Sequence, residues 1–333
     1  KTFTARNLNI ENVTSDVLLT SVSGVLLSSL KGNAATNSTD NSSLVLENIT
    51  LSNVNLKTED GWAKGTIGGI VGSATAYNGV IKDIVVLNTS LEGYSAVGGV
   101  IASGRFFNVE IDSIIADADI VTGQGGGVAF GNVGATYSAT NQSITAKNIA
   151  VFGTLHKKDH PSEAYGGVLG GVASSMSIPL ENVLSDVQIT GVKADKYYGI
   201  GDVQYKYGVF TGSIEGSFEN RSNQYPTRHS TNLGGNNVSS AVNLASKINI
   251  TNKLVDHTIT NGVNSTSSST AIGILALDSI EGNYNQYPYL KKTITEDLAK
   301  SDYTYMELGF DMFSTWSTNN GTTYPYIKSL DRL

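Results

Sequence analysis

Four acidic residues lie close together in the sequence and could take part in chemistry: Glu110, Asp112, Asp117 and Asp119. Side chains two positions apart on a β-strand share a face, so the first two and the last two could form acidic pairs. Such pairs could hold Ca²⁺ or act as acid and base on a glycosidic bond. Lyase chemistry also needs a strong cation beside the base, and only Arg105 is near. A solvated acidic face is therefore the leading interpretation, and a glycan-active site is the alternative.

Tyrosines form a second cluster, at Tyr197, Tyr198, Tyr205 and Tyr207. Clustered tyrosines can stack on sugars or anchor a protein partner through their large, rigid rings. Packing within an irregular region is the competing explanation for this cluster. Of all the side chains in the sequence, these tyrosines are the best candidates for ligand binding.

The sequence lacks the short motifs of common catalytic and nucleotide sites. It has no His-Glu-x-x-His, no Gly-x-Ser-x-Gly, no P-loop and no cysteine. His156 and His160 are four residues apart, a spacing that lets a helix hold one metal ion. Pro161 follows them and the flanking residues do not predict a helix, so this stretch is interpreted as a polar loop. We expect no catalytic residue, no metal site and no cofactor in this chain.

Composition restricts the class of protein. The chain of 333 residues has a net charge of −7 and no run of Lys or Arg, which argues against nucleic-acid binding. No stretch reaches the roughly 18 consecutive apolar residues of a membrane span. Zero cysteines with abundant Asn, Ser, Thr and Gly are typical of a bacterial protein that is secreted or displayed on the cell surface, with Gram-positive bacteria favoured. A start without a signal peptide suggests a piece of a longer polypeptide.

One sequence motif recurs along the chain and predicts how the elements are arranged. Each of four full copies has a polar residue, an alternating strand, a turn, and then Gly-Gly with a short apolar strand, and a fifth copy begins in the same way but loses the pattern. Copies begin at Asn48, Asp83, Ser113, Asn148 and Asn182, which are 30 to 35 residues apart. Such self-similarity indicates stacked repeats that bury a shared core. The predicted fold class is all-β, a right-handed parallel β-helix (solenoid) whose leading polar residues stack as a ladder at equivalent corners.

A short helical and aromatic cap is expected at the C-terminal end of this solenoid. Thr295 is suited to be the N-cap of a helix over 295–301, because its hydroxyl can accept a backbone hydrogen bond. An aromatic tail follows, with Trp316 and the run 324–327, and could cover the exposed end of the stack. The predicted division is 1–203 for the β-helix with Gly-Gly repeats, 204–282 for an irregular excursion and the last coils, and 283–333 for the cap.

The Gly-Gly segments and the Asn-led strands before them resemble the GLUG-type repeats of bacterial surface proteins. The fuller pattern resembles the β-helical region of the streptococcal-type zinc metalloproteases that cleave immunoglobulin A1. The likeness is carried by Leu46–Gly72, Ile81–Gly99, Leu180–Gly191 and a closing run from Ile294 to Ile327. The zinc motif of that family does not occur in this sequence, so no catalytic residue can be carried over.

The resemblance implies a non-catalytic scaffold and recognition module ahead of a protease domain, where it would position or recognise the antibody substrate. Any zinc would then lie in that separate catalytic domain. The partners would be other domains of the same polypeptide together with host immunoglobulin or a host glycan. Two other functions stay open: a free-standing adhesin that binds host glycan or protein, and a polysaccharide lyase or hydrolase that uses the 105–119 face.

Overall fold

Parallel β-strands make up most of the described structure, and they form two sheets with an apolar core between them. The protein is all-β, as the sequence predicts, with little helix among the described residues. The computed structural model describes residues 1–15, 18–32, 41–59, 65–123, 125–135, 143–158, 163–166, 168–171, 180–190, 205–208, 250–255, 297, 300–319 and 321–330.

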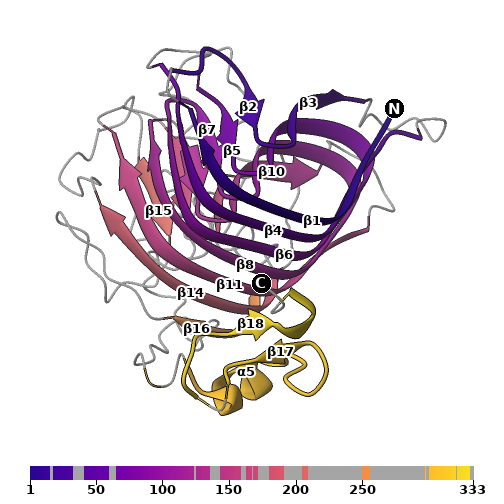
Figure 1. Ribbon diagram of the computed structural model, residues 1–333, viewed down its shortest axis with the longest axis vertical. Coiled ribbons are helices and arrows are strands. Elements are labelled where there is room, and N and C mark those ends of the chain that lie inside the picture. The colour runs from indigo at the N-terminus through magenta and orange to yellow at the C-terminus, as the bar shows by residue number, and fades with distance from the viewer. Residues whose placement is uncertain are drawn as a thin grey trace, which may run out of the picture.

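The larger sheet contains the long strands, which follow one another in chain order, each parallel to the one before (Figure 1). Parallel neighbours in chain order arise when every repeat returns the chain to the same starting side. Three short strands add to it: β3 (Leu27–Lys31) pairs with the first residues of β6, β10 (Phe130–Ala135) pairs with the first residues of β8, and β13 (Leu169–Gly171) pairs with β10. The long strands are β1 (Thr2–Thr14), β4 (Ser43–Lys57), β6 (Val71–Gly93), β8 (Ile101–Thr122), β11 (Ile144–Lys157), β14 (Leu180–Thr190) and β16 (Ile250–Val255).

The smaller sheet is built from the Gly-Gly segments. Gly68 pairs with Gly98, and Gly98 pairs with Gly127, so glycines form a column across the strands. A side chain at Gly68 would overlap the carbonyl oxygen of Val71, which explains why this column is closed to larger residues. The strands are β2 (Ser23–Gly24), β5 (Ile67–Gly68), β7 (Ala96–Gly98), β9 (Gly125–Gly127), β12 (Glu163–Gly166) and β15 (Tyr205–Gly208).

One repeat aligns differently from its sequence pattern. The pattern matches Gly126 with Gly98 as the first glycine of each pair. In the structure Gly126 pairs with Val97, and Gly127 pairs with Gly98, a displacement of one residue. Gly125 precedes these two, so three consecutive glycines were available to fill the column and the sequence alone could not choose between them.

Polar residues bend the long strands at matching positions. The predicted corner residues all have positive φ, between 51° and 60°. Asn and Asp enter this left-handed region at a lower cost than other residues that carry a side chain. Side-chain hydrogen bonds join the first and the last pair of corners: Asn48 Nδ2 donates to Asn7 Oδ1 at 2.7 Å, and Asn182 Nδ2 donates to Asn148 Oδ1 at 2.9 Å. The structure therefore contains the predicted ladder, whose members are Asn48, Asp83, Ser113, Asn148 and Asn182, preceded by Asn7 on β1.

Charged residues of alternating sign form a second column, one position before each corner. Two ion pairs join neighbouring members of the column, one between Arg6 and Glu47 and one between Lys147 Nζ and Asp112 Oδ2 at 3.4 Å. A slip of one residue would remove every one of these neighbours, so the column favours the observed register. In order of position its members are Arg6, Glu47, Lys82, Asp112, Lys147 and Glu181.

The core between the sheets consists of like residues stacked on like. Ile49, Ile84, Ile114 and Ile149 pair across four strands and are all fully buried. Complete burial of one such side chain contributes about 1.5–3 kcal/mol to folding. Each of these isoleucines comes directly after a corner residue, so the first side chain beyond the corner is buried in the core.

The described C-terminal segment, residues 300–330, contacts the larger sheet. It contains α5 (Asp302–Leu308), β17 (Trp316–Ser317), β18 (Tyr326–Ile327) and the 3₁₀ helix η5 (Lys328–Leu330), and β17 pairs antiparallel with β18. It packs on the outward face of the larger sheet, with α5 near β14 and β16 and η5 near β4 (Figure 1, yellow). The helix predicted over 295–301 lies mostly outside the described residues, and α5 begins after it.

The predicted middle part, 204–282, is described only at β15 and β16. These strands pair with β12 and β14 respectively and so extend both sheets by one more repeat. The other residues of this part lie outside the described residues. Within the described part of the chain, no helix has both the length and the apolar character needed to cross a membrane.

Candidate functional site

Part of the outward face of the larger sheet is apolar, although it is turned away from the core. Val85, Ile115, Ala150 and Leu184 pair in register on β6, β8, β11 and β14, and all four are buried. The C-terminal segment covers this column. Apolar residues stand on both sides of Val85, Ile115 and Ala150 in the sequence, a pattern typical of a strand buried on both faces.

Aromatic side chains hold the C-terminal segment on the sheet. Trp316 is fully buried, and its ring lies 4.9 Å from that of Phe310, which lies 5.3 Å from that of Tyr305, both edge to face. Each such pair contributes about 0.5–1.5 kcal/mol beyond the burial of its area. Gly309 ends α5 at φ 94°, and its carbonyl accepts a 3.3 Å hydrogen bond from Asn182 of the corner ladder. The segment is therefore tied directly to the repeats.

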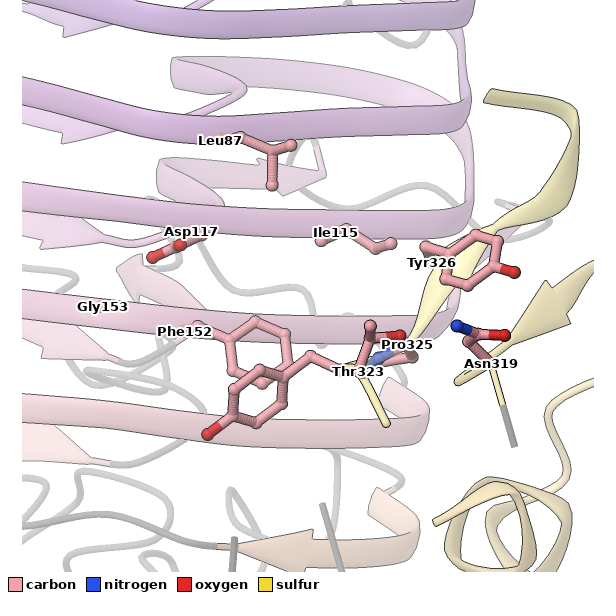
Figure 2. Close-up of a pocket in the computed structure, with 10 residues that line it drawn as sticks. Leu87, Ile115, Asp117, Phe152, Gly153, Asn319, Thr323, Pro325 and Tyr326 are labelled. Atoms are coloured by element: carbon pink, nitrogen blue, oxygen red, sulfur yellow. The ribbon is translucent and has the colours of Figure 1, made fainter. Parts of the chain in front are cut away.

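A cleft of about 730 Å³ lies between the sheet and the C-terminal segment. The sheet supplies Leu87, Ile115, Asp117 and Phe152, and residues 319–326 supply the opposite wall. Figure 2 shows Phe152 and Tyr326 on opposite sides of Ile115. Ligand pockets commonly combine apolar walls with a few polar groups, and this cleft has that composition.

The aromatic rings of the cleft come from both of its sides. Phe152 of β11 contacts Tyr324 of the C-terminal segment, with 4.7 Å between ring centroids and a tilt of 54°. The ammonium group of Lys300 lies 5.2 Å from the centroid of the Tyr324 ring, within the range of a cation–π contact. Tyr326 is only partly buried, so part of its ring is accessible to a ligand.

Asp117 is the one charged residue among the described residues that line the cleft. Burial raises the pKa of its carboxyl group above the ordinary value, and the negative charge of Asp119 raises it further. A half-buried carboxylate of this kind is stabilised when a donor or a cation approaches it. The cleft therefore has a negative site beside its aromatic walls.

The predicted acidic face is divided by the corner at Ser113. Asp117 and Asp119 share the outward face beyond the corner, and the exposed Asp119 accepts a 2.6 Å hydrogen bond from Thr154 Oγ1. Glu110, also exposed, lies before the corner, on the same strand as Asp112. The four carboxylates thus fall into two separate pairs on β8.

Asp112 is occupied by structural contacts. Its carboxylate is buried and accepts hydrogen bonds from Asn148 Nδ2 at 2.7 Å and from Ser113 Oγ at 3.0 Å, in addition to the ion pair with Lys147. These contacts belong to the corner ladder and the charge column. Asp112 therefore holds neighbouring repeats together, a role that sequence reasoning did not assign to it.

A second hollow, of about 380 Å³, lies between the corner ladder, at Asp83, Ser113 and Asn148, and the C-terminal segment. Burial raises the pKa of Asp83 there, although the charge of Lys82 opposes this. Asp311 accepts hydrogen bonds from the Ser314 side chain and from the backbone amides of Ser314 and Phe313, which lower its pKa. These two carboxylates of the hollow thus belong to a corner, at Asp83, and to a local turn, at Asp311.

Two of the four candidate tyrosines fall on described residues. Tyr205 and Tyr207 belong to β15, and Tyr207 pairs with Tyr165 on β12. Tyr197 and Tyr198 lie outside the described residues. The structure thus places half of this cluster at the last described strand of the smaller sheet, on a different sheet from the cleft.

The histidines do not form a described metal site. His156 is exposed near the end of β11, and His160 lies outside the described residues. Among the residues that the structure does describe, no group of three or more His, Cys, Asp or Glu side chains could hold a metal ion.

Sequence reasoning missed the cleft because its aromatic residues were assigned to other roles or to none. Tyr324 and Tyr326 were expected in an end cap, and Phe152 was not singled out. The sequence did contain one indication of the cleft. Outward-facing positions of a half-buried strand are normally polar, whereas Leu87 and Ile115 are apolar.

Comparisons of this chain with protein-family models, with curated proteins and with solved structures gave no match. Any function must therefore be argued from the residues and geometry of the chain itself.

Proposed function

We propose that this chain is a non-catalytic scaffold and recognition module of an extracellular bacterial protein, secreted or held on a Gram-positive cell surface, and that it folds as a right-handed parallel β-helix. Support for the fold comes from the two parallel sheets, the matched corners and the shared core, which are features of stacked coils. An experimental structure in which the chain winds with the opposite hand would refute this fold.

One observation supports the recognition role: the cleft beneath the C-terminal segment. Its volume of about 730 Å³ is in the range of ordinary ligand sites, and aromatic rings line two of its sides. Aromatic residues dominate the energetics of many protein and ligand interfaces. The proposed ligand is a host protein, immunoglobulin in the first place, or a host glycan.

The resemblance to the streptococcal-type metalloproteases supports placing this module in a larger zinc protease that acts on immunoglobulin A1. The module would then present the antibody to a separate catalytic domain, which would hold the zinc. A His-Glu-x-x-His motif downstream in the parent gene would agree with this assignment. A cell-wall anchor after further repeats, without that motif, would replace it with a free-standing adhesin.

A polysaccharide lyase or hydrolase has less support from the geometry. Asp112 is occupied by the ladder, and Arg105 lies near the start of β8 whereas Asp117 lies near its end. The described residues lining the cleft include no cation that could assist a base. Incubation with acidic polysaccharides, with and without calcium, should release no cleaved products; release would restore the enzymatic alternative.

Binding of the full chain to immunoglobulin A1, to other serum proteins and to a glycan array tests the proposal. Tyr326→Ala removes one wall of the cleft, and Thr323→Trp fills it from an exposed position. Both variants should weaken the detected binding at least about tenfold. Tyr303→Ala, on the exposed face of α5, is the matched control and should bind normally. Normal binding by both cleft variants would refute the cleft, and loss in Tyr205→Ala would move recognition to β15.

A further inference from the structure

We propose that the cleft binds a cationic side chain, arginine or lysine, presented by a protein partner, with Asp117 as its counter-charge and the rings of Phe152 and Tyr326 as its walls. This inference rests on the proposed function, which assigns recognition to the cleft, and it adds the chemical class of the ligand.

Charge is the first argument for a cation. Asp117 carries the one charge among the described lining residues, and Asp119 lies two positions further on the same outward face. The side chains that pack around Asp117 from β6 and β11, Leu87 and Phe152, are uncharged. An incoming cation would therefore meet two carboxylates, whereas an acidic glycan would be repelled by both.

The aromatic walls are the second argument. A guanidinium or ammonium group is attracted to the face of an aromatic ring by about 0.5–2 kcal/mol, depending on how far it is desolvated. Phe152 and Tyr326 stand on opposite sides of the cleft floor at Ile115 (Figure 2). Lys300 already makes this kind of contact with Tyr324 from outside the lining residues, so the same chemistry is present at the rim.

Size argues for a side chain carried by a peptide. A cleft of about 730 Å³ exceeds the volume of one ammonium group, so backbone and flanking side chains of a partner would fill the remainder. The polar side chains of Asn319 and Thr323 lie at the opposite wall and could pair with the backbone of such a segment. The occupant is thus a basic segment of a protein.

Burial of Asp117 also predicts how binding depends on pH. Its pKa is raised by burial and then by the negative charge of Asp119. A cation stabilises the ionised carboxylate, so affinity is highest above this pKa. Affinity should fall as the pH drops through the pKa of Asp117, and it should also fall as the salt concentration rises.

Titration calorimetry with the full chain tests the inference, using acetyl-Gly-Arg-Gly-amide and acetyl-Gly-Lys-Gly-amide as probes. Citrulline and norleucine peptides are the neutral controls and should bind at least about tenfold more weakly. Asp117→Asn should weaken arginine binding by about tenfold as well. Glu110→Gln makes the same change of charge on the same strand outside the cleft, and it should bind like the wild type.

The outcomes separate this inference from the proposed function. Equal binding of arginine and citrulline peptides, no binding by either, or normal binding by Asp117→Asn would overturn the cationic ligand. If Tyr326→Ala still lost serum-protein or glycan binding in that case, the cleft would remain the recognition site for a neutral ligand. If the cleft variants also bound normally there, both proposals would be wrong.

Discussion

The side-chain amide of Asn148 donates a 2.7 Å hydrogen bond to the carboxylate of Asp112, which lies 36 residues earlier in the sequence on the neighbouring strand. Asn148 is a corner residue at φ 55°, and Asp112 belongs to the charge column one position before the corners. The contact therefore joins two columns that each specify register. A slipped strand would lose the corner and the ion pair together, so these few polar residues strongly favour one arrangement of the repeats.

Removal of the Asn148 side chain should destabilise the repeats in two separable ways. Asn148→Gly keeps the positive φ at low cost but loses the hydrogen bonds to Asp112 and Asn182, a loss of about 1–3 kcal/mol. Asn148→Ala loses the same bonds and adds about 1 kcal/mol of backbone strain. Urea unfolding of both variants measures the difference. Equal stability of the alanine and glycine variants would show that the corner conformation is not specified at this residue.

Trp316 should anchor the C-terminal segment by its volume alone. Its ring is fully buried, but its indole nitrogen has no hydrogen-bond partner. Trp316→Ala should therefore cost about 3–5 kcal/mol, and Trp316→Phe should cost much less. Hydrogen exchange of residues 302–330 reports release of the segment from the sheet. If both variants released the segment to the same extent, the volume of the side chain would not explain the anchoring, and the indole N–H would have to contribute to it.

Glu92 should contribute to stability mainly above acidic pH. Partial burial raises its pKa, but hydrogen bonds and charges from Lys158 at 2.7 Å and Lys57 at 2.8 Å outweigh this and lower it below 4.5. Its stabilisation is complete above the pKa of the unfolded chain and is lost as the pH falls through the lowered folded-state pKa. Because Glu92 is still partly exposed to solvent, which screens both ion pairs, the contribution is less than about 1 kcal/mol.

Unfolding free energies of wild type and Glu92→Gln, measured across this pH range, check the prediction. The two curves should differ at neutral pH and converge in acid, and added salt should reduce the difference. A constant difference at every pH would assign the effect to packing and not to charge.

Asp117→Asn should stabilise the protein while it weakens binding. The raised pKa of Asp117 means that the folded state disfavours the ionised carboxyl group, so ionisation lowers stability as the pH rises above the ordinary value of 3.8. At about pH 7 the variant should therefore melt at a higher temperature than the wild type, and at about pH 3 the two should melt alike. A variant that is less stable at neutral pH would indicate that the carboxylate has a partner in the folded state.

Local features of this fold could be predicted from the sequence. The leading polar residue of each copy, such as Asn48 or Asn148, stands at a corner because Asn tolerates the left-handed conformation and can bond to its counterpart in the next repeat. The glycine column was also predictable, because close contact between layers excludes a side chain at Gly68. Both features depend on a residue and its equivalent in the next copy, which a periodic sequence displays directly.

The location of the C-terminal segment could not be predicted in the same way. Residues such as Trp316 and Tyr326 are not part of the repeat, so periodicity gives no information about which strands they contact. Their position depends on long-range packing against Val85, Ile115 and Phe152, which come from three different strands. The candidate cleft forms between these two groups, and so the sequence alone identified Asp117 but not its surroundings.

The two walls of the cleft are separated by about half of the chain, since the sheet contributes residues between 87 and 153 and the C-terminal segment contributes residues between 319 and 326. During synthesis the early strands can assemble on a nascent chain, but the second wall is translated much later. Ligand capture by this site is therefore possible only after translation has passed residue 326. A prematurely terminated product could have well-ordered strands and still be unable to bind.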